Sequence, residues 1–336
     1  MIIRGNTVST TMPRTNYEQT DPAKADYLRG KAVLDQKIAD AQTAADNAKT
    51  EAKTEAKTYT DSAVKKAAPR NRLDNSDFTN PVNQRGQTSY ANTGYTIDRW
   101  RVNAGKYKVE IVSGGIKLTN NDTERRYLEQ IINRPDLIGK TLTVVVEHTD
   151  GTVRFGTAKV HDNASTSANV AYTFGTNSYV GVVNWNGNPA VWIALGSTES
   201  TTIKNIAIYE GEYTAETLPE YQPKGYGAEL AECQRYYYQS WTGATIGANG
   251  ILLKEAFTSA RLISVDLPCE MRVTPTISIC KTDGTANAVS EYVTSTTVTN
   301  VSVVYANNKS FIPAQQSSGF TAGKVYSLHY TASADL

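Results

Sequence analysis

The sequence predicts a mainly β protein with an N-terminal α-helical coiled coil and two β-sandwich or jelly-roll domains. Residues 21–68 form a low-complexity stretch rich in alanine, lysine and threonine, and Pro69 ends it. After Pro69, apolar and polar residues alternate in short runs separated by turn signals such as SGG, TDG and NWNGNP. Short strands at regular spacing are typical of sandwiches and jelly rolls.

The composition indicates a soluble chain of two or three domains. Of its 336 residues, 40% are hydrophobic and 20% are charged, and the net charge is +1. This balance excludes a global attraction to nucleic acid or to an anionic membrane surface. No apolar run is long enough to insert across a membrane.

Residues 1–20 are polar, rich in threonine and asparagine, and show no helical period. A segment of this kind cannot fold alone, so we expect an extended arm that docks on something or stays disordered. Its candidate anchors are Ile2, Ile3 and Tyr17. The arm contains no apolar signal region, and we therefore expect synthesis in the cytoplasm without a signal peptide.

Residues 21–68 are predicted to form one long helix, with Asp21 as N-cap and Pro22 in the first turn. A seam then recurs in alternating steps of four and three, as in the a and d positions of a coiled coil. The seam consists of Tyr27, Lys31, Leu34, Ile38, Ala41, Ala45, Ala48 and Ala52, and a stutter follows at Ala56. A monomeric surface helix and a flexible spacer remain alternatives, and an alanine seam does not fix the oligomeric state.

Residues 69–228 are expected to form the first β domain, a jelly roll. Its predicted strands are 106–112, 115–118, 141–148, 152–160, 169–174, 180–185, 190–195 and 203–209, with a loop or short helix at NRPDLIGKT. Residues 229–336 are expected to form a second, smaller sandwich after a short helix within YGAELAECQRYYYQSW. Its predicted strands are 251–257, 260–267, 276–279, 298–305 and 324–330.

The three cysteines, Cys233, Cys269 and Cys280, are an odd number without C-x-x-C spacing, and the chain has only three histidines. This pattern predicts buried free thiols rather than a zinc site.

Four segments resemble pieces that phage fibre proteins carry in the same order: NRLDNSDF, NQRG, YTIDRW and LPEYQPKGYGAELAECQRYY. A segment like VDLPCEMRVTPTIS and an ending near YTASADL follow them, as in those proteins. From residue 70 to residue 336 the chain resembles the tail-fibre or receptor-binding proteins of tailed bacteriophages, prophages and related contractile particles. The first β domain is similar to jelly-roll carbohydrate-binding modules.

The resemblance implies a homotrimeric fibre of the virion, attached to tail or baseplate proteins through its N-terminus. The distal β domains are then expected to bind a bacterial surface polysaccharide or another receptor. The alternative is a structural baseplate or spacer protein of a phage tail or contractile bacteriocin. A glycan hydrolase is the third reading, but no carboxylate pair stands out and no G-x-S-x-G, H-E-x-x-H or phosphate-loop motif occurs, so we expect no enzyme.

The turn in VVNWNGNPAVW is the first candidate glycan site. Asn184, Asn186 and Asn188 supply amides that donate to and accept from hydroxyl groups, and Trp185 supplies a flat face for a sugar ring. The alternative is a plain hairpin in which Trp185 caps the sheet. If Trp185 belongs to the site, Trp185→Ala is expected to weaken binding and to leave stability nearly unchanged.

The segment QRYYYQSW is the second candidate, with Tyr237 and Trp241 as tentative ligand contacts and packing between the β domains as the alternative. Trp100 and Trp192 lie in apolar alternating stretches and are expected in the core. Asp98 and Arg99 are expected to pair with each other.

Asp77 in LDNSDF lies where similar modules place a structural calcium ligand, which makes it the one metal candidate. The rest of such a ligand set is not visible in the sequence, and no other cofactor is expected.

Overall fold

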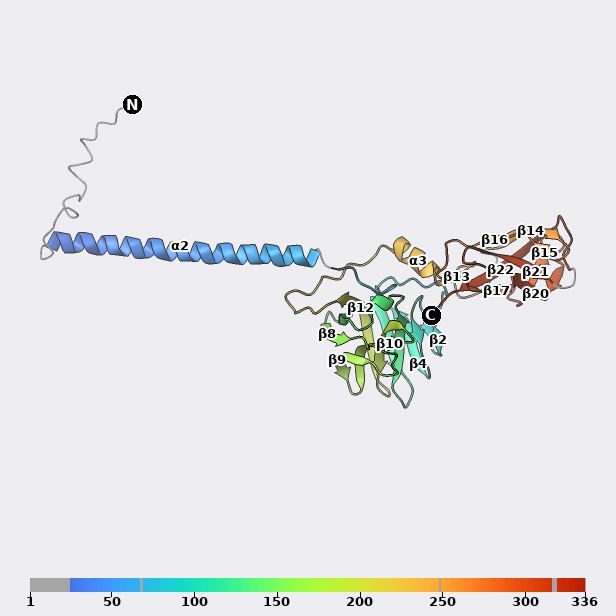
Figure 1. Cartoon of the computed structure of the whole chain (residues 1–336), viewed down its shortest axis with the longest axis horizontal. Helices are drawn as coiled ribbons and strands as arrows, with labels where there is room; N and C mark the ends of the chain where they lie inside the picture. The colour runs from blue at the N-terminus through green and yellow to red at the C-terminus, as the bar shows by residue number, and fades with distance from the viewer. Residues whose placement is uncertain (1–24, 67–68, 248, 316–318, 336) are drawn as a thin grey trace, which may run out of the picture. The chain divides into compact units, whose positions relative to one another are not determined.

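The computed structural model describes residues 25–66, 69–247, 249–315 and 319–335. The chain divides into two compact units: residues 1–68 with 216–219, and residues 69–215 with 220–336. In the first unit residues 25–66 form one helix, and the second unit consists mainly of antiparallel strands (Figure 1). Within the described residues, no helix combines the length and the apolar character needed to cross a membrane.

Helix α2 (Ala25–Lys66) is 42 residues long. The side chains of residues 31–60 are exposed, and they include the seam residues Leu34 and Ile38, whose exposed fractions are 42% and 58%. An i, i+4 ion pair joins Lys31 and Asp35 at 2.5 Å. The predicted helix is therefore confirmed over these residues, while Asp21, Pro22 and the arm of residues 1–20 lie outside the described residues. The coiled-coil pairing of its seam stays a prediction.

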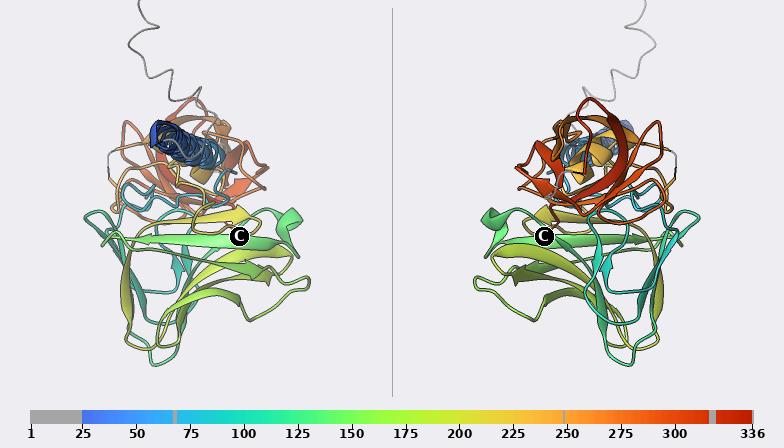
Figure 2. Two further views of the ribbon diagram at one scale, coloured as in Figure 1. Left: turned by 90° about the vertical axis from the view of Figure 1, so that its left-hand side faces the viewer. Right: turned by 90° about the vertical axis from the view of Figure 1, so that its right-hand side faces the viewer.

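Two six-stranded antiparallel sheets face each other in the first β domain, in strand orders β1-β4-β5-β12-β7-β8 and β2-β3-β6-β11-β10-β9. The strands of the first sheet are β1 (Ser89–Tyr90), β4 (Tyr107–Val112), β5 (Gly115–Asn120), β7 (Thr141–His148), β8 (Val153–Lys159) and β12 (Ser200–Glu210). Those of the second are β2 (Gly94–Tyr95), β3 (Arg101–Val102), β6 (Arg126–Ile131), β9 (Asn169–Gly175), β10 (Ser178–Trp185) and β11 (Asn188–Leu195). The two layers can be followed in Figure 2.

The core of this domain lies between its two sheets and is made by alternate residues of their strands. Trp100 is fully buried there, as predicted, and its ring meets Phe78 edge-on at 5.4 Å between centroids. The indole nitrogen of Trp100 donates to the carbonyl of Asn75, which satisfies its one polar group. The predicted corner at NRPDLIGKT is the short 3₁₀ helix η1 (Pro135–Leu137).

All predicted strands of the first domain are present, but the sequence reading missed β6, which lies beside β11 in the second sheet. Its sequence, RYLEQI, places polar residues on both faces. The buried Gln130 exchanges two hydrogen bonds with the backbone of Asp74, and the buried Glu129 pairs with Arg101. Tertiary partners therefore make this polar strand stable, and no local pattern signals them.

The ten described strands of the second β domain form one hydrogen-bonded antiparallel network, and its division into a two-sheet sandwich stays a prediction. The long strand β22 (Val325–Ser333) is its centre and pairs with β13, β14, β17 and β18. The other strands are β13 (Tyr237–Gln239), β14 (Leu252–Thr258), β15 (Arg261–Leu262), β16 (Val265–Asp266), β17 (Thr276–Cys280), β18 (Ala288–Glu291), β19 (Thr297–Thr299), β20 (Val301–Val304) and β21 (Ser310–Gln315). They enclose a separate core around Phe311 and Leu328.

In this domain one predicted helix is shorter than expected and two predicted strands are divided. The helix becomes α3 (Tyr226–Gln234), and the residues after it turn into β13, because Tyr237 to Gln239 pair with β22. The predicted strand 298–305 breaks at Asn300, which has a positive φ of 58°. The predicted strand 260–267 is divided into β15 and β16.

Candidate functional site

The hairpin between β10 and β11 uses the side chain of one predicted ligand residue, Asn184, to build its own turn. Asn186 and Gly187 adopt φ angles of 50° and 86°, as a two-residue hairpin turn requires. The buried Asn184 accepts from the amide of Gly187 at 2.9 Å and donates to the carbonyl of His161 at 3.2 Å. Asn188 is half-buried, so that only Asn186 of the predicted asparagines is exposed.

Trp185 is half-buried and meets Trp192 edge-on at 6.1 Å between ring centroids. Trp192 is only 3% exposed, as expected of a core residue, but it belongs to a separate cluster with Ile131, Val183 and Ala190. Since Val191 and Ile193 face the core between the sheets, Trp192 points to the opposite, outer face. The outer face of the second sheet therefore carries its own aromatic cluster.

Strand pairing extends this outer face beyond the hairpin. Ala194 of β11 is paired with Tyr127 of β6 on one side and with Tyr179 of β10 on the other. Directly paired residues point to the same face, so the two tyrosines flank a small alanine on the outer face. The ring of Tyr127 also lies 4.6 Å from that of Trp192.

Residues 160–168, which join β8 to β9, pass close to this face. A Cβ atom at Gly181 would lie 2.6 Å from the carbonyl oxygen of Asn169 and 3.2 Å from Cβ of Ala168. Glycine at this position therefore permits the close approach of the connection to β10. The connection supplies one wall of a groove above the sheet.

We call this hollow the outer groove, and its volume is about 370 Å³. It is lined by Arg125, Tyr127, Thr166, Ser167, Ala168, Val170, Thr173, Asn177, Ser178 and Tyr179. The lining combines two aromatic rings with hydroxyl groups, an amide and one guanidinium. Among the described residues that line it, none carries a carboxylate.

Arg125 supplies the charge of the outer groove. Its guanidinium carbon lies 5.0 Å from the centroid of the Tyr179 ring, within the range of a cation–π contact. Its Nε lies 3.5 Å from the hydroxyl oxygen of Tyr127, a weak hydrogen bond. Burial raises the pKa of Tyr179 to about 12, so its hydroxyl group stays protonated and able to donate at neutral pH.

The second candidate segment lies elsewhere. The guanidinium of Arg85 lies 3.7 Å from the ring centroid of Tyr237, and the side chain of Gln84 donates to the Tyr237 carbonyl. Trp241 packs edge-on against His329 of β22 at 5.6 Å. Tyr237 thus packs between the two β domains and Trp241 within the second, and the structure does not bring them into the outer groove.

Arg85 also binds two carboxylates. Its Nη atoms lie 2.9 Å from Asp98 and 2.9 Å from Asp335, and both acids are almost fully buried. Burial raises the pKa of Asp98 to about 6, although the charge of Arg85 acts in the opposite direction. The expected pair of Asp98 with Arg99 is wrong, because Arg99 turns to Asp74 at 3.2 Å and stacks on Tyr236.

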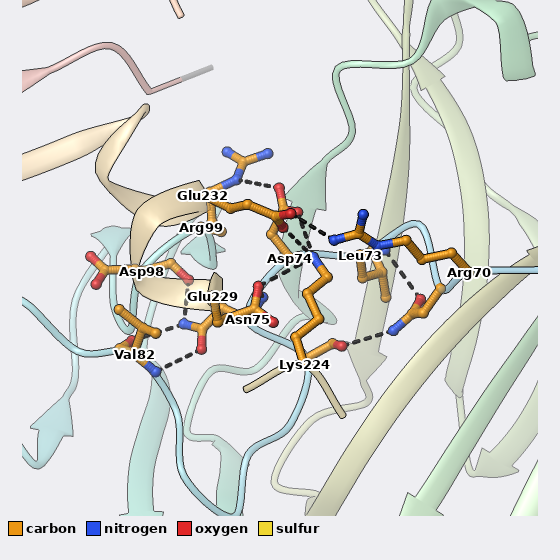
Figure 3. Close-up of polar contacts among 12 residues, drawn as sticks. Arg70, Leu73, Asp74, Asn75, Val82, Asp98, Arg99, Lys224, Glu229 and Glu232 are labelled. Carbon is orange, nitrogen blue, oxygen red and sulfur yellow. Dashed lines mark hydrogen bonds and ion pairs between the residues drawn. The ribbon is translucent and has the colours of Figure 1, made fainter. Parts of the chain in front are cut away.

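Figure 3 shows the acidic group around Lys224, in which Asp74, Glu229 and Glu232 converge. Lys224 Nζ lies 3.2 Å from Asp74 and 3.5 Å from Glu229, and it also contacts Glu232. The ammonium group therefore stands where a cation would balance these acids. Glu229 accepts from the amide of Asn75 at 2.5 Å, so α3 is fastened to the first domain by this group.

Asp77 makes a local turn instead of joining an acidic cluster. Its Oδ1 accepts from the amide and the hydroxyl group of Thr79, at 3.0 Å and 2.6 Å. Within the described residues, the single group of three or more potential metal ligands is the one at Lys224, and it does not include Asp77. A calcium ion at Asp77 stays a prediction.

The three thiols are free, as predicted, but only Cys233 is fully buried, and Cys269 and Cys280 are half-buried.

Comparison of this chain with protein-family models, with curated proteins and with solved structures found no match.

Sequence reasoning missed Arg125, Tyr127 and Tyr179, which build the outer groove. Tyr179 lies more than fifty residues after Arg125 and Tyr127 in the sequence. The three residues meet only through the pairing of β6, β11 and β10. The one signal in the sequence was that Tyr127, Glu129 and Ile131 alternate with their neighbours, as residues on one face of a strand do. This strand, β6, was not predicted. The sequence contains 20 tyrosines against 6 phenylalanines, and this excess indicates the residue type but not the positions.

Proposed function

We propose that this chain is a receptor-binding protein of a phage-type fibre, which attaches its particle to a bacterial surface glycan through the outer groove. The observation that carries the proposal is the pair of tyrosines on either side of Ala194 in an open groove with hydroxyl and amide groups. Aromatic rings offer flat apolar faces, and hydroxyl and amide groups exchange hydrogen bonds with sugar hydroxyls.

Binding without catalysis fits the chemistry of this groove. Glycosidases commonly require two carboxyl groups at a defined separation. The part of the chain that lines the groove, all of it described, supplies a guanidinium and hydroxyl groups instead. Sugar hydroxyls already bond well to water, so each hydrogen bond to the protein contributes only about 0.5–1.5 kcal/mol.

Weak single sites require several copies, and the helix offers a means of assembly. Leu34 and Ile38 of the predicted seam are exposed in one chain, and their burial between parallel helices would stabilise an oligomer. We propose a homotrimer, whose linked sites raise avidity by roughly 10²–10⁴-fold. Sedimentation of the full chain at micromolar concentration should give an elongated trimer, and a monomer would contradict the stalk.

The binding site is tested with two matched tyrosine variants. Tyr127→Leu removes an aromatic face of the outer groove, whereas Tyr305→Leu removes an exposed tyrosine of the second domain, which also lies beside an arginine. We expect Tyr127→Leu to reduce binding of the full chain to host cells and to extracted wall glycans at least tenfold. Tyr305→Leu should bind as the unchanged chain does. Equal binding by all three proteins would contradict the proposed site.

A structural role in the particle is the second candidate, and the surface of the second β domain favours it. Several large apolar side chains there are exposed: Phe257 at 75%, Val293 at 79%, Tyr305 at 68% and Tyr292 at 57%. Such residues suit contact with another protein. Loss of particle assembly in Phe257→Ser, with glycan binding absent in every variant, would support this reading over receptor binding.

A further inference from the structure

Arg125 differs from the arginine beside it, because none of the described acidic residues pairs with it. Arg126 pairs with Asp122 and Glu124, each at 2.9 Å. Arg125 is exposed at the outer groove and, within the part of the chain that is described, makes no ion pair. Its contacts are the ring of Tyr179 and the hydroxyl group of Tyr127. Both leave most of its five N–H donors available to a ligand.

We infer that the outer groove selects glycans that carry an acidic group, which Arg125 binds while Tyr127 and Tyr179 contact the sugar. This inference rests on the proposed function and names the class of glycan. The positive charge stands alone in a groove whose described lining contains no carboxylate. The carboxylate of Glu199 lies beside the lining and accepts a hydrogen bond from the hydroxyl group of Ser178.

The geometry around Arg125 favours an oxyanion over a neutral hydroxyl group. A guanidinium presents parallel N–H donors that match two oxygens of a carboxylate or a phosphate. The face of the Tyr179 ring beneath the guanidinium limits the positions that the side chain can take, so less freedom is lost on binding. Hydrogen bonds to charged groups are about twice as strong as those between neutral groups.

Two kinds of bacterial glycan carry such a group: polymers with hexuronic acids and polymers with phosphodiester links. Their shared chemistry is a sugar ring next to an oxyanion. A carboxylate is planar and can be bound by two N–H groups in one plane, whereas a phosphodiester is tetrahedral. Both belong in the test as separate probes.

The experiment measures dissociation constants of the full chain for three oligosaccharides of equal length: a neutral one, its hexuronic-acid counterpart and a phosphodiester-linked one. Variants Arg125→Gln, Arg261→Gln and Tyr127→Leu are compared with the unchanged chain. Arg261 is the matched control, because its guanidinium also lies over a tyrosine ring, that of Tyr305 at 5.1 Å.

The unchanged chain should bind at least one acidic oligosaccharide about 10–100-fold more tightly than the neutral one. Arg125→Gln should abolish this preference, and Arg261→Gln should alter neither the preference nor the affinity for the neutral oligosaccharide. The preference should also shrink as ionic strength rises.

The failures of the inference and of the proposed function differ. Equal affinity of the unchanged chain for all three probes, with a loss only in Tyr127→Leu, overturns acidic selection and leaves glycan binding intact. An acidic preference that survives in Arg125→Gln also overturns the role of Arg125. No binding of any probe, or full binding by Tyr127→Leu, overturns the proposed site together with the inference.

Discussion

Arg85 and Arg125 both lie against tyrosine rings, and their surroundings differ completely. Arg85 lies on Tyr237 between the β domains, where Asp98 and Asp335 neutralise it. Arg125 lies over Tyr179 in the outer groove, without an acidic partner among the described residues. The same pair of side chains thus forms a structural joint in one place and an open site in the other.

The difference indicates that a tyrosine ring and a guanidinium are open to a ligand where no carboxylate of the protein pairs with the guanidinium. Judged from sequence, QRYYYQSW was the richer aromatic segment. Two of its arginine partners, however, bind acids inside the protein: Arg85 binds Asp98 and Asp335, and Arg99 binds Asp74. A third, Arg272, lies over Tyr236 and donates to the carbonyl of Ala334. A ligand would have to displace these acids from a buried position, which is costly.

The largest expected effect contrasts the two arginines directly. Arg85→Met should lower the free energy of unfolding by about 3–5 kcal/mol at pH 7.5, because it leaves two buried carboxylates unpaired. Arg125→Met should stay within about 0.5 kcal/mol, since its side chain is exposed. Urea unfolding of both variants measures the two changes in the free energy of unfolding. Equal changes would contradict the distinction between a structural Arg85 and an exposed Arg125.

A smaller effect concerns the pH dependence of stability at the cluster of Arg85, Asp98 and Asp335. Burial raises the pKa of Asp98 from 3.8 to about 6, so the folded protein holds this proton more tightly than the unfolded chain does. The resulting stabilisation is complete below pH 3.8 and is lost as the pH rises through about 6. Relative to Asp98→Asn, the unchanged chain should therefore lose on the order of 3 kcal/mol between these limits.

Chemical unfolding at closely spaced pH values measures this difference. Other acids titrate in the same range, and subtraction of the Asp98→Asn curve removes their contribution to first order. A difference curve that is flat between pH 4 and pH 6.5 would show that Asp98 has an ordinary pKa.

The smallest expected effect concerns Trp185 at the edge of the outer aromatic cluster. Because Trp185 is half-buried against Trp192, Trp185→Ala should lower stability by about 1–2 kcal/mol rather than leave it unchanged. Glycan affinity should fall less than in Tyr127→Leu, since Trp185 does not line the groove. Thermal unfolding measures the loss of stability, and cell binding compares the loss of affinity in the two variants. A larger loss of affinity in Trp185→Ala than in Tyr127→Leu would place the binding site at the hairpin.

The sequence predicted the elements with strong local patterns and missed those held by distant partners. Helix α2 and the strands around Val144 or Ile193 carry clear periodicity. Strand β6 does not, since its Gln130 and Glu129 are stabilised by Asp74 and Arg101.

The same limit applies to the candidate site. The hairpin of Trp185 was located correctly as a turn, but the residues of the groove are brought together by strand register. The turn fixes the register of β10 against β11, whereas the pairing that brings Tyr127 beside Ala194 joins segments distant in the sequence. From the sequence alone, the alternation of Val191, Trp192 and Ile193 could indicate only that Trp192 points to the opposite face of the sheet from its two neighbours.

The most direct test of the central claim uses the four tryptophans as reporters. Full chain labelled with 5-fluorotryptophan should give separate ¹⁹F signals for Trp100, Trp185, Trp192 and Trp241, whose surroundings differ. On addition of extracted wall glycan, the signals of Trp192 and Trp185 should shift, because Trp192 contacts Tyr127 of the outer groove. Those of Trp100 and Trp241 should stay unchanged. A shift confined to Trp241 would contradict the account and place recognition in the second β domain.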